Sequence, residues 1–146
     1  MPQSILITGC SSGIGYNAAH TLHERGWKVI AACRQRTDCE RLQDEGLTTV
    51  LLDYEDDISI KTALSQTLKH TGGRLDAVFN NGAYAIPGPV EDLSRDALRA
   101  IFEANFFGYF DLINQLMPLF RKQGHGRIVQ CSSLLGMTAL RYRGAY

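Results

Sequence analysis

The chain begins with a glycine-rich turn, Thr8-Gly9-Cys10-Ser11-Ser12-Gly13-Ile14-Gly15, that decides its fold. A short apolar run at residues 4–7 precedes the turn and predicts a buried strand. An amphipathic stretch at residues 14–25 follows it and predicts a helix, which Gly26 is placed to end. The first unit of the chain is therefore a strand, a tight turn and a helix.

This turn has the chemistry of an anion site. Gly9, Gly13 and Gly15 tolerate the positive φ that a sharp turn needs, and without a Cβ they let a ligand approach the backbone. The N-terminus of the following helix attracts anions through its unpaired N–H groups and its dipole. Ser11 and Ser12 add hydroxyl donors. The pattern favours a turn that binds the pyrophosphate of a dinucleotide, and the alternative is an ordinary connection between strand and helix.

The composition is that of an ordinary globular domain. The chain has 146 residues, 45% of them apolar and 21% charged, which predicts one domain over residues 1–146 with a core of its own. Fifteen basic and fifteen acidic side chains cancel, so the charge favours neither nucleic acid nor a membrane surface as a partner. We expect no signal peptide, and no run approaches the roughly 20 apolar residues of a membrane span.

The four cysteines are predicted to be free thiols. Cys10, Cys33, Cys39 and Cys131 form no C-x-x-C pair, and no histidine pair accompanies them at zinc spacing. We therefore expect no metal site and a reducing, cytoplasmic location.

Strands and helices are predicted to alternate along the chain. Apolar runs at residues 28–33, 48–52, 75–79 and 127–131 predict four more strands, with helical segments between them. Such alternation is typical of an α/β fold with a doubly wound parallel sheet of the Rossmann type. Ligands bind beyond the carboxyl ends of the strands in these sheets. The polar clusters of the sequence fall at these ends: residues 9–15, Arg34, Asp53, residues 80–81 and residues 132–133.

A long helix is predicted after Ser94, which is its candidate N-cap. Pro118 is expected to kink its last turns or to end it. Asn105 falls on its apolar stripe, and a buried amide without partners costs about 1–3 kcal/mol. Asn105 is therefore bonded to a neighbouring segment, or belongs to a site, or both. The expected stripe consists of Leu98, Ile101, Phe102, Phe106, Tyr109, Phe110, Ile113 and Met117.

Several motifs follow one another along the chain in a characteristic order and spacing. The turn fits the pattern TGxxxGxG, Asp53 follows the third strand, and Asn-Asn-Gly-Ala at residues 80–83 follows the fourth. Asn105 lies in the long helix, and Ser133 and Tyr146 follow the fifth strand, 13 positions apart. As a set, these motifs resemble the short-chain dehydrogenase/reductase family over the whole chain. The likeness is greatest to members loosely described as retinol- or steroid-dehydrogenase-like.

The resemblance implies an oxidoreductase that transfers a hydride between NADP(H) and a small alcohol, ketone or aldehyde. Tyr146 would be the acid/base, Ser133 would hydrogen-bond the substrate oxygen, and Asn105 would hold a water in a proton relay. Because a tyrosine with a pKa near 10 is a poor base at neutral pH, Tyr146 needs a positive neighbour. The residues implied in cofactor binding are Gly9, Ser11, Ser12, Gly13, Ile14, Gly15, Arg34, Asp53, Asn80 and Gly82.

Arg34 favours NADP over NAD. An NAD site places an acid at the end of the second strand, whereas an NADP site supplies arginine for the 2′-phosphate. Here the strand ends in Cys33, and Arg34 and Arg36 follow. The alternative is that Arg34 is a solvated loop residue. Asp53 resembles the family's adenine contact, and it could equally cap the next helix.

Two departures from the family pattern bear on activity. The family usually has Asn-Asn-Ala-Gly where residues 80–83 are Asn-Asn-Gly-Ala, which keeps two small residues. The lysine of the family's Y-x-x-x-K pattern is absent from the sequence, which stops at Tyr146. We therefore expect an inactive fragment whose fifth strand is an open edge, and we expect the parent protein to be a homo-oligomer. The alternative is a non-catalytic dinucleotide-binding or regulatory protein on the same scaffold.

Overall fold

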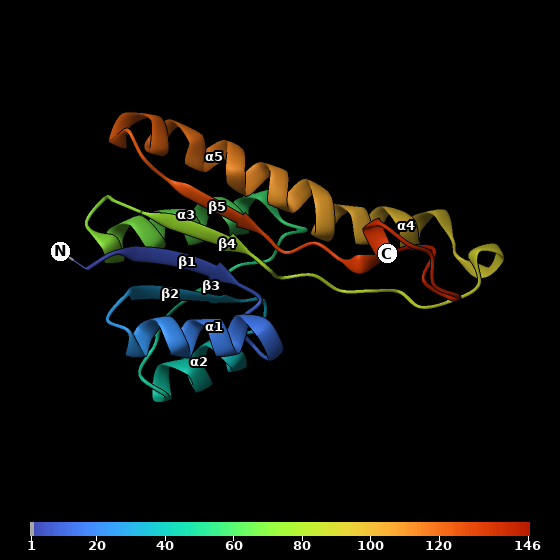
Figure 1. Cartoon of the computed structure of the whole chain (residues 1–146), viewed down its shortest axis with the longest axis horizontal. Coiled ribbons are helices and arrows are strands. Elements are labelled where there is room, and N and C mark those ends of the chain that lie inside the picture. Colours follow the sequence, from blue (N-terminus) through green and yellow to red (C-terminus); the bar gives the residue numbers. More distant parts are fainter. Residues whose placement is uncertain (1) are drawn as a thin grey trace.

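The computed structural model describes residues 2–146 as a parallel sheet of five strands with helices on both faces (Figure 1). The strands are β1 (Ser4–Thr8), β2 (Lys28–Cys33), β3 (Thr48–Leu51), β4 (Ala77–Asn80) and β5 (Arg127–Gln130). The main helices are α1 (Gly13–Glu24), α2 (Arg36–Asp44), α3 (Asp57–Thr71), α4 (Arg95–Phe102) and α5 (Gly108–Gln123). The strand order is β3-β2-β1-β4-β5 and every pairing is parallel, which confirms the predicted doubly wound fold.

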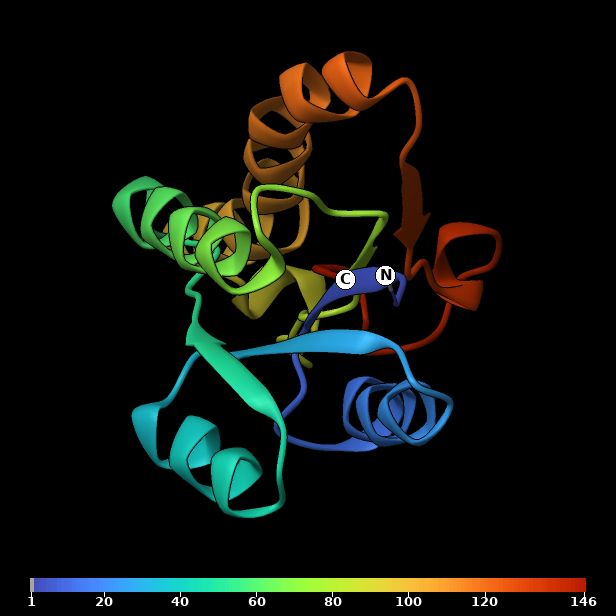
Figure 2. The ribbon, with the colours of Figure 1, turned by 90° about the vertical axis from the view of Figure 1, so that its left-hand side faces the viewer.

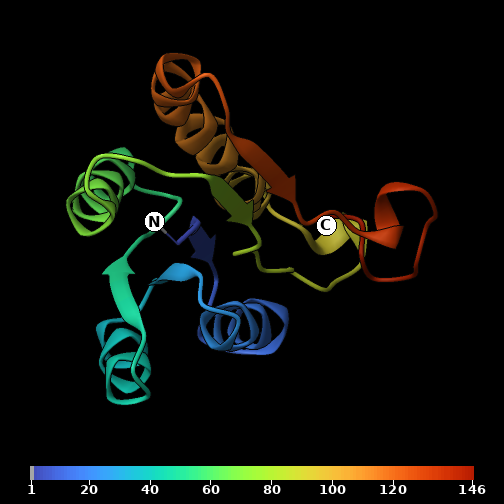
Figure 3. The same cartoon turned by 60° about the vertical axis from the view of Figure 1, so that its left-hand side comes forward.

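The side chains of the strands alternate between two core layers. Ile5 and Ile7 of β1 pack with the layer that contains α1 and α2, whereas Leu6 between them packs with the layer of α3 and α5. Figure 2 shows α1 and α2 below the sheet and α3 and α5 above it. Because the central strands are buried on both faces, residues 5–7 of β1 and 29–33 of β2 are unbroken apolar runs. In Figure 3, β5 lies at one edge of the sheet, as predicted for the fifth strand.

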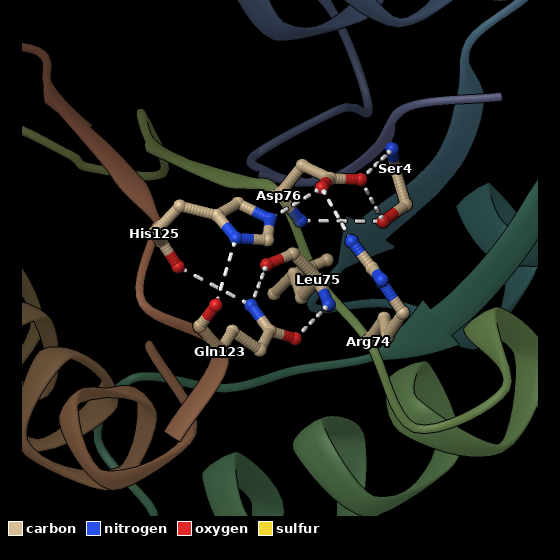
Figure 4. A network of polar contacts seen from close by, with 6 residues as sticks. All are labelled: Ser4, Arg74, Leu75, Asp76, Gln123 and His125. Carbon is tan, nitrogen blue, oxygen red and sulfur yellow. Dashed lines mark hydrogen bonds and ion pairs between the residues drawn. The ribbon is translucent and has the colours of Figure 1, made fainter. Parts of the chain in front are cut away.

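Asp76 ties the amino ends of the strands together (Figure 4). Its Oδ2 accepts hydrogen bonds from the backbone N–H and the hydroxyl of Ser4, at 2.7 and 2.9 Å. Its Oδ1 lies 2.9 Å from His125 Nε2 and 3.9 Å from Arg74 Nη2. Burial raises the pKa of Asp76, but the bonds from Ser4 and His125 outweigh this effect and hold the pKa below its ordinary value. The network fixes the sheet at the end opposite to the loops that follow the strands.

The predicted long helix is interrupted by a π-helical turn. Ser94 caps α4 as predicted, because its Oγ accepts from the Ala97 N–H at 3.1 Å. The π-helical turn then spans Glu103–Phe107, and α5 follows it directly. A π turn contains one more residue than an α turn, so side chains after it are rotated relative to those before it.

The apolar stripe predicted for this segment is wrong in part, because the π turn rotates the helical face that follows it and because Phe102, before the turn, already lies off the buried face. Ile101 and Tyr109 are buried as expected, but beyond Tyr109 the fully buried face is formed by Leu112, Leu116 and Phe120. Three phenylalanines of the predicted stripe are exposed instead, together with a fourth beside them. These four side chains, with exposed fractions of 46–57%, are Phe102, Phe106, Phe107 and Phe110.

Pro118 does not end the helix. It lies inside α5, which continues to Gln123. The carbonyl that loses a donor to the proline belongs to Asn114, and Asn114 is exposed, so water can satisfy that carbonyl. Among residues 2–146, no helix combines the length and the apolar character needed to cross a bilayer.

Candidate functional site

A cavity of about 280 Å³ lies at the carboxyl ends of the central strands, beside the glycine-rich turn. In Figure 1, the carboxyl ends of the strands are the arrow tips, from which the loops after the strands extend. Six of the ten predicted cofactor residues line it: Gly9, Ser11, Ser12, Arg34, Asp53 and Gly82. The other lining residues are Thr8, Leu52, Tyr54, Asn81, Ala83, Tyr84 and Ala104. The structure does not place Gly13, Ile14, Gly15 or Asn80 on this wall.

The glycine turn packs against the turn that follows β4. Gly9 has a φ of +66°, and a Cβ added there would lie 2.5 Å from Gly82 Cα. A Cβ added at Gly15 would overlap the carbonyl oxygen of Gly9. The order Gly82-Ala83 therefore places a glycine where the backbone of Gly9 passes closest, which explains in part why small residues are needed at both turns.

Thr8 and Tyr54, to which sequence analysis gave no role, hold these turns in place. Thr8 Oγ1 accepts from the N–H groups of Asn81 and Gly82, at 2.9 and 3.0 Å, and lies 2.9 Å from the Tyr54 hydroxyl. The Tyr54 hydroxyl also donates to Asn80 Oδ1 at 2.6 Å. The Asn80 side chain is thus fully buried and serves the fold, so contact of this side chain with a cofactor stays a prediction.

Asp53 caps a turn at the mouth of the cavity. Its Oδ1 accepts from the Glu55 N–H at 3.0 Å, and its own N–H donates to Ser59 Oγ at 3.0 Å. The side chain that caps α3 is instead Asp56, which accepts from the Ile58 N–H. The alternative that Asp53 caps this helix is therefore not the arrangement in the structure.

The end of β2 carries no negative charge. Arg34 is exposed and lines the cavity, whereas the Cys33 side chain before it is buried. Burial, with smaller contributions from Cys39 and Asp38, raises the pKa of the Cys33 thiol to about 12. At neutral pH this thiol is uncharged, so the guanidinium of Arg34 is not neutralised by the residue before it.

Asn105 is bonded to the loop after β4. It lies in the π-helical turn, where its Oδ1 accepts from the Tyr84 N–H at 3.1 Å and its Nδ2 donates to the Tyr84 carbonyl at 2.8 Å. The structure thus confirms the first alternative, that Asn105 is bonded to a neighbouring segment. The oxygen and the nitrogen of the Asn105 amide each keep capacity for one further hydrogen bond, because Oδ1 has a second lone pair and Nδ2 a second hydrogen.

Ser133 and Tyr146 follow β5. Ser133 Oγ accepts from the Leu135 N–H at 3.1 Å and caps a 3₁₀ turn, Leu134–Gly136. Tyr146 has an exposed fraction of 44% and lines a second hollow, formed by residues of this turn and of the segment after it. Within residues 2–146, no hydrogen bond joins the side chains of Asn105, Ser133 and Tyr146.

Comparison with known proteins gives the same assignment as the motifs. The family profile described as short chain dehydrogenase matches residues 3–146. The chain is 40% identical over 146 residues to a protein of Escherichia coli K12 named uncharacterized oxidoreductase YbbO, covering 100% of this chain and 54% of that protein. It is 32% identical to human retinol dehydrogenase 8, covering 99% of this chain and 49% of that protein. The chain thus spans about half the length of the curated relatives it matches.

Solved structures agree with the sequence relatives. A short-chain dehydrogenase from Streptomyces avermitilis superimposes with a TM-score of 0.91 at 29% identity, covering 99% of this chain and 54% of that one. A gluconate 5-dehydrogenase from Burkholderia cenocepacia, at 23% identity and a TM-score of 0.85, shares the fold. The profile match over nearly the whole chain confirms the resemblance, and the chain belongs to the short-chain dehydrogenase family of oxidoreductases.

Proposed function

We propose that the protein is an NADP-dependent oxidoreductase that interconverts an alcohol and a carbonyl compound. The observation that carries the proposal is the cavity beside the glycine turn, which brings Ser11, Ser12, Arg34 and Asp53 together without an acid at the end of β2. When bound, the nicotinamide cofactor supplies the hydride for carbonyl reduction. The protein's own residues bind it and handle the proton.

The site fits a phosphate-bearing ligand. The backbone N–H groups of Ser12 and Gly13 make no hydrogen bond to any other group within residues 2–146, and they stand at the N-terminus of α1. Unpaired N–H groups at a helix N-terminus attract anions. Arg34 adds an exposed cation for a 2′-phosphate, and Asp53 adds an acceptor for an adenine amino group.

The proposed chemical roles are those of Tyr146, Ser133 and Asn105. Ser133 accepts one hydrogen bond through its oxygen, so its hydroxyl hydrogen is available to a substrate carbonyl. Asn105 can hold a water with the capacity that Tyr84 leaves open. Tyr146 would donate the proton to the substrate oxygen, provided that a positive neighbour lowers its pKa.

Cofactor choice is tested by titrating the full product of the gene with NADPH and NADH. We expect tighter binding of NADPH, and a shift towards NADH in the double variant Cys33→Asp, Arg34→Ala. Arg25→Ala, at the far end of α1, is the matched control and should leave both affinities unchanged. Equal or tighter binding of NADH by the unchanged protein would contradict the assignment.

Turnover is tested with a panel of ketones and aldehydes. Ser133→Ala, Asn105→Ala and Tyr146→Phe should each lower kcat while cofactor affinity is kept, since these groups act on the reacting oxygen or its proton. Ser132→Ala is the control, because it removes the same hydroxyl one residue away. Full activity of a variant would return that residue to a purely structural role.

We further propose a cytoplasmic homo-oligomer that acts on small molecules, with neither nucleic acid nor a membrane as partner. Four free thiols and a balanced charge support the location and the class of partner. The exposed phenylalanines around the π-helical turn support self-association. Light scattering of the full gene product measures its mass in solution, and a monomer would contradict this part of the proposal.

A further inference from the structure

Arg41 reaches the glycine-rich turn from a different helix. It lies in α2, and its Nη2 donates to the carbonyl oxygen of Ser11 at 2.7 Å. Ser11 lines the cavity, whereas Arg41 does not. The bond joins residues 30 positions apart, so it exists only because the fold brings α2 against the turn.

The guanidinium of Arg41 is held by several groups at once. Its Nη1 lies 3.0 Å from Glu45 Oε1, and its Nη2 lies 3.6 Å from Asp38 Oδ1. Its Cζ stands 5.5 Å from the centre of the Tyr16 ring on α1. Glu45 is in turn held by His20, whose Nε2 lies 2.8 Å from Glu45 Oε2. The position of the guanidinium is therefore determined by both helices.

A fixed carbonyl at Ser11 fixes the next N–H group. The peptide unit is planar and trans, so the Ser11 carbonyl and the Ser12 N–H point in opposite directions. Holding that carbonyl towards Arg41 turns the Ser12 N–H away from α2. This N–H and that of Gly13 make no hydrogen bond within the described chain. We assign both N–H groups to the cofactor phosphates.

We propose that Arg41 is a positioning residue that holds the glycine-rich turn ready for the phosphates of the cofactor by binding the Ser11 carbonyl. The inference rests on the proposed function and adds a residue to it. Arg41 acts through geometry rather than charge, because Asp38 and Glu45 neutralise it. Arg34 differs in lining the cavity itself. A lysine could not replace Arg41 fully, since only the guanidinium fork can bond Ser11 and Glu45 with separate nitrogens in one plane.

The test compares Arg41→Gln and Arg41→Lys with Lys61→Gln in the full product of the gene. Lys61 is the matched control because it makes the same kind of exposed pair four residues along a helix, with Asp57 at 2.7 Å, and does not line the cavity. Binding of NADPH, of adenosine 2′,5′-bisphosphate and of adenosine is measured by calorimetry, with Tm recorded for each variant.

Arg41→Gln is expected to raise the Kd for NADPH and for the bisphosphate about tenfold, because the ligand must then order the turn when it binds. Arg41→Lys should raise it by less, and adenosine, which has no phosphate, should bind all three variants alike. The Tm should fall somewhat more than in Lys61→Gln, because Arg41 has more partners, and kcat at saturating NADPH should be unchanged.

The outcomes separate this inference from the proposed function. If the unchanged protein binds NADPH and Arg41→Gln binds it equally well, the role of Arg41 is overturned while the function stands. If affinity for adenosine falls in parallel with that for NADPH, Arg41 supports the fold in general and the inference is equally overturned. If Arg41→Gln does not fold, Arg41→Lys decides, and unchanged affinity in that variant overturns the proposal. Failure of the unchanged protein to bind NADPH contradicts the proposed function itself.

Discussion

Two tyrosines whose rings are in contact in the core, Tyr54 and Tyr109, are expected to respond in opposite directions to the same substitution. Their ring centroids lie 4.8 Å apart, and both side chains are 8% exposed. The Tyr54 hydroxyl is hydrogen-bonded to Thr8 and Asn80, whereas the Tyr109 hydroxyl is the one buried side-chain polar atom in the described residues that has no partner. The two positions therefore differ in hydrogen bonding and hardly at all in apolar packing.

The expected free energies follow from these bonds. Tyr54→Phe leaves Asn80 Oδ1 buried without its donor, which costs about 1–3 kcal/mol. Thr8 Oγ1 is less affected because the N–H groups of Asn81 and Gly82 still donate to it. Tyr109→Phe removes a buried hydroxyl whose desolvation nothing offsets, so we expect a stability change between zero and a gain of about 1–2 kcal/mol. The two variants should differ by about 1–5 kcal/mol, or roughly 2–20 °C in Tm for a chain of this length.

Urea unfolding of both single variants and of the double variant measures these changes. The double variant should show the sum of the two effects, because the hydroxyl groups share no partner. A loss of more than about 1 kcal/mol in Tyr109→Phe would refute the reasoning by showing that its hydroxyl has a partner. Unchanged stability of Tyr54→Phe would refute it equally.

Two further predictions concern Gly108, the first residue of α5, and the Asp76 network at the amino ends of the strands. Gly108→Ala would place a Cβ 2.5 Å from both the Cβ and the carbonyl oxygen of Tyr54, so we expect a loss of about 1–3 kcal/mol in urea unfolding, and a neutral effect would contradict this packing. Asp76 has a lowered pKa in the folded protein, so its contribution is complete above the unfolded value of about 4 and is lost as the pH falls through the folded value. Asp76→Asn should therefore be less stable than the unchanged protein at pH 7, and the difference should shrink towards pH 3; a constant difference would exclude the charged pair as its cause.

The sheet could be predicted because each strand is marked in its own residues. Residues 28–33 form β2 with the predicted bounds. The strands β1, β3 and β5 begin as predicted and end one residue away, and β4 begins two residues later and ends one residue later than predicted. Burial on both faces makes the inner positions of a central strand apolar, and glycine or a polar cluster ends it. No long-range information is needed for such a pattern.

In the helical segment from Arg95 to Gln123, the local sequence pattern does not predict which side chains are buried. An α-helical period was applied across Glu103–Phe107, where the chain makes a π turn. Nothing in the residue types of this segment distinguishes Phe106 from Tyr109, yet the first is 57% exposed and the second is buried. Phe106 lies inside the π turn and Tyr109 shortly after it, and the π turn coincides with the pairing of the Asn105 side chain to the backbone of Tyr84.

The residues of the candidate site likewise fall into those that the sequence predicts and those that only the fold reveals. The turn at residues 8–15 and Asp53 were recognisable because a motif and a strand end mark them in the sequence. Tyr54 follows Asp53 directly, but adjacent residues there point to different surroundings, one to the cavity mouth and one to Thr8 and Asn80 in the core. Arg41 is the clearest case: in sequence it is one partner of an ordinary helical pair with Glu45, and only the crossover that sets α2 beside the glycine turn gives its guanidinium the Ser11 carbonyl to bind. Residues whose chemistry lies in one segment can be found from sequence, whereas residues that position another segment become visible only when the fold joins the two.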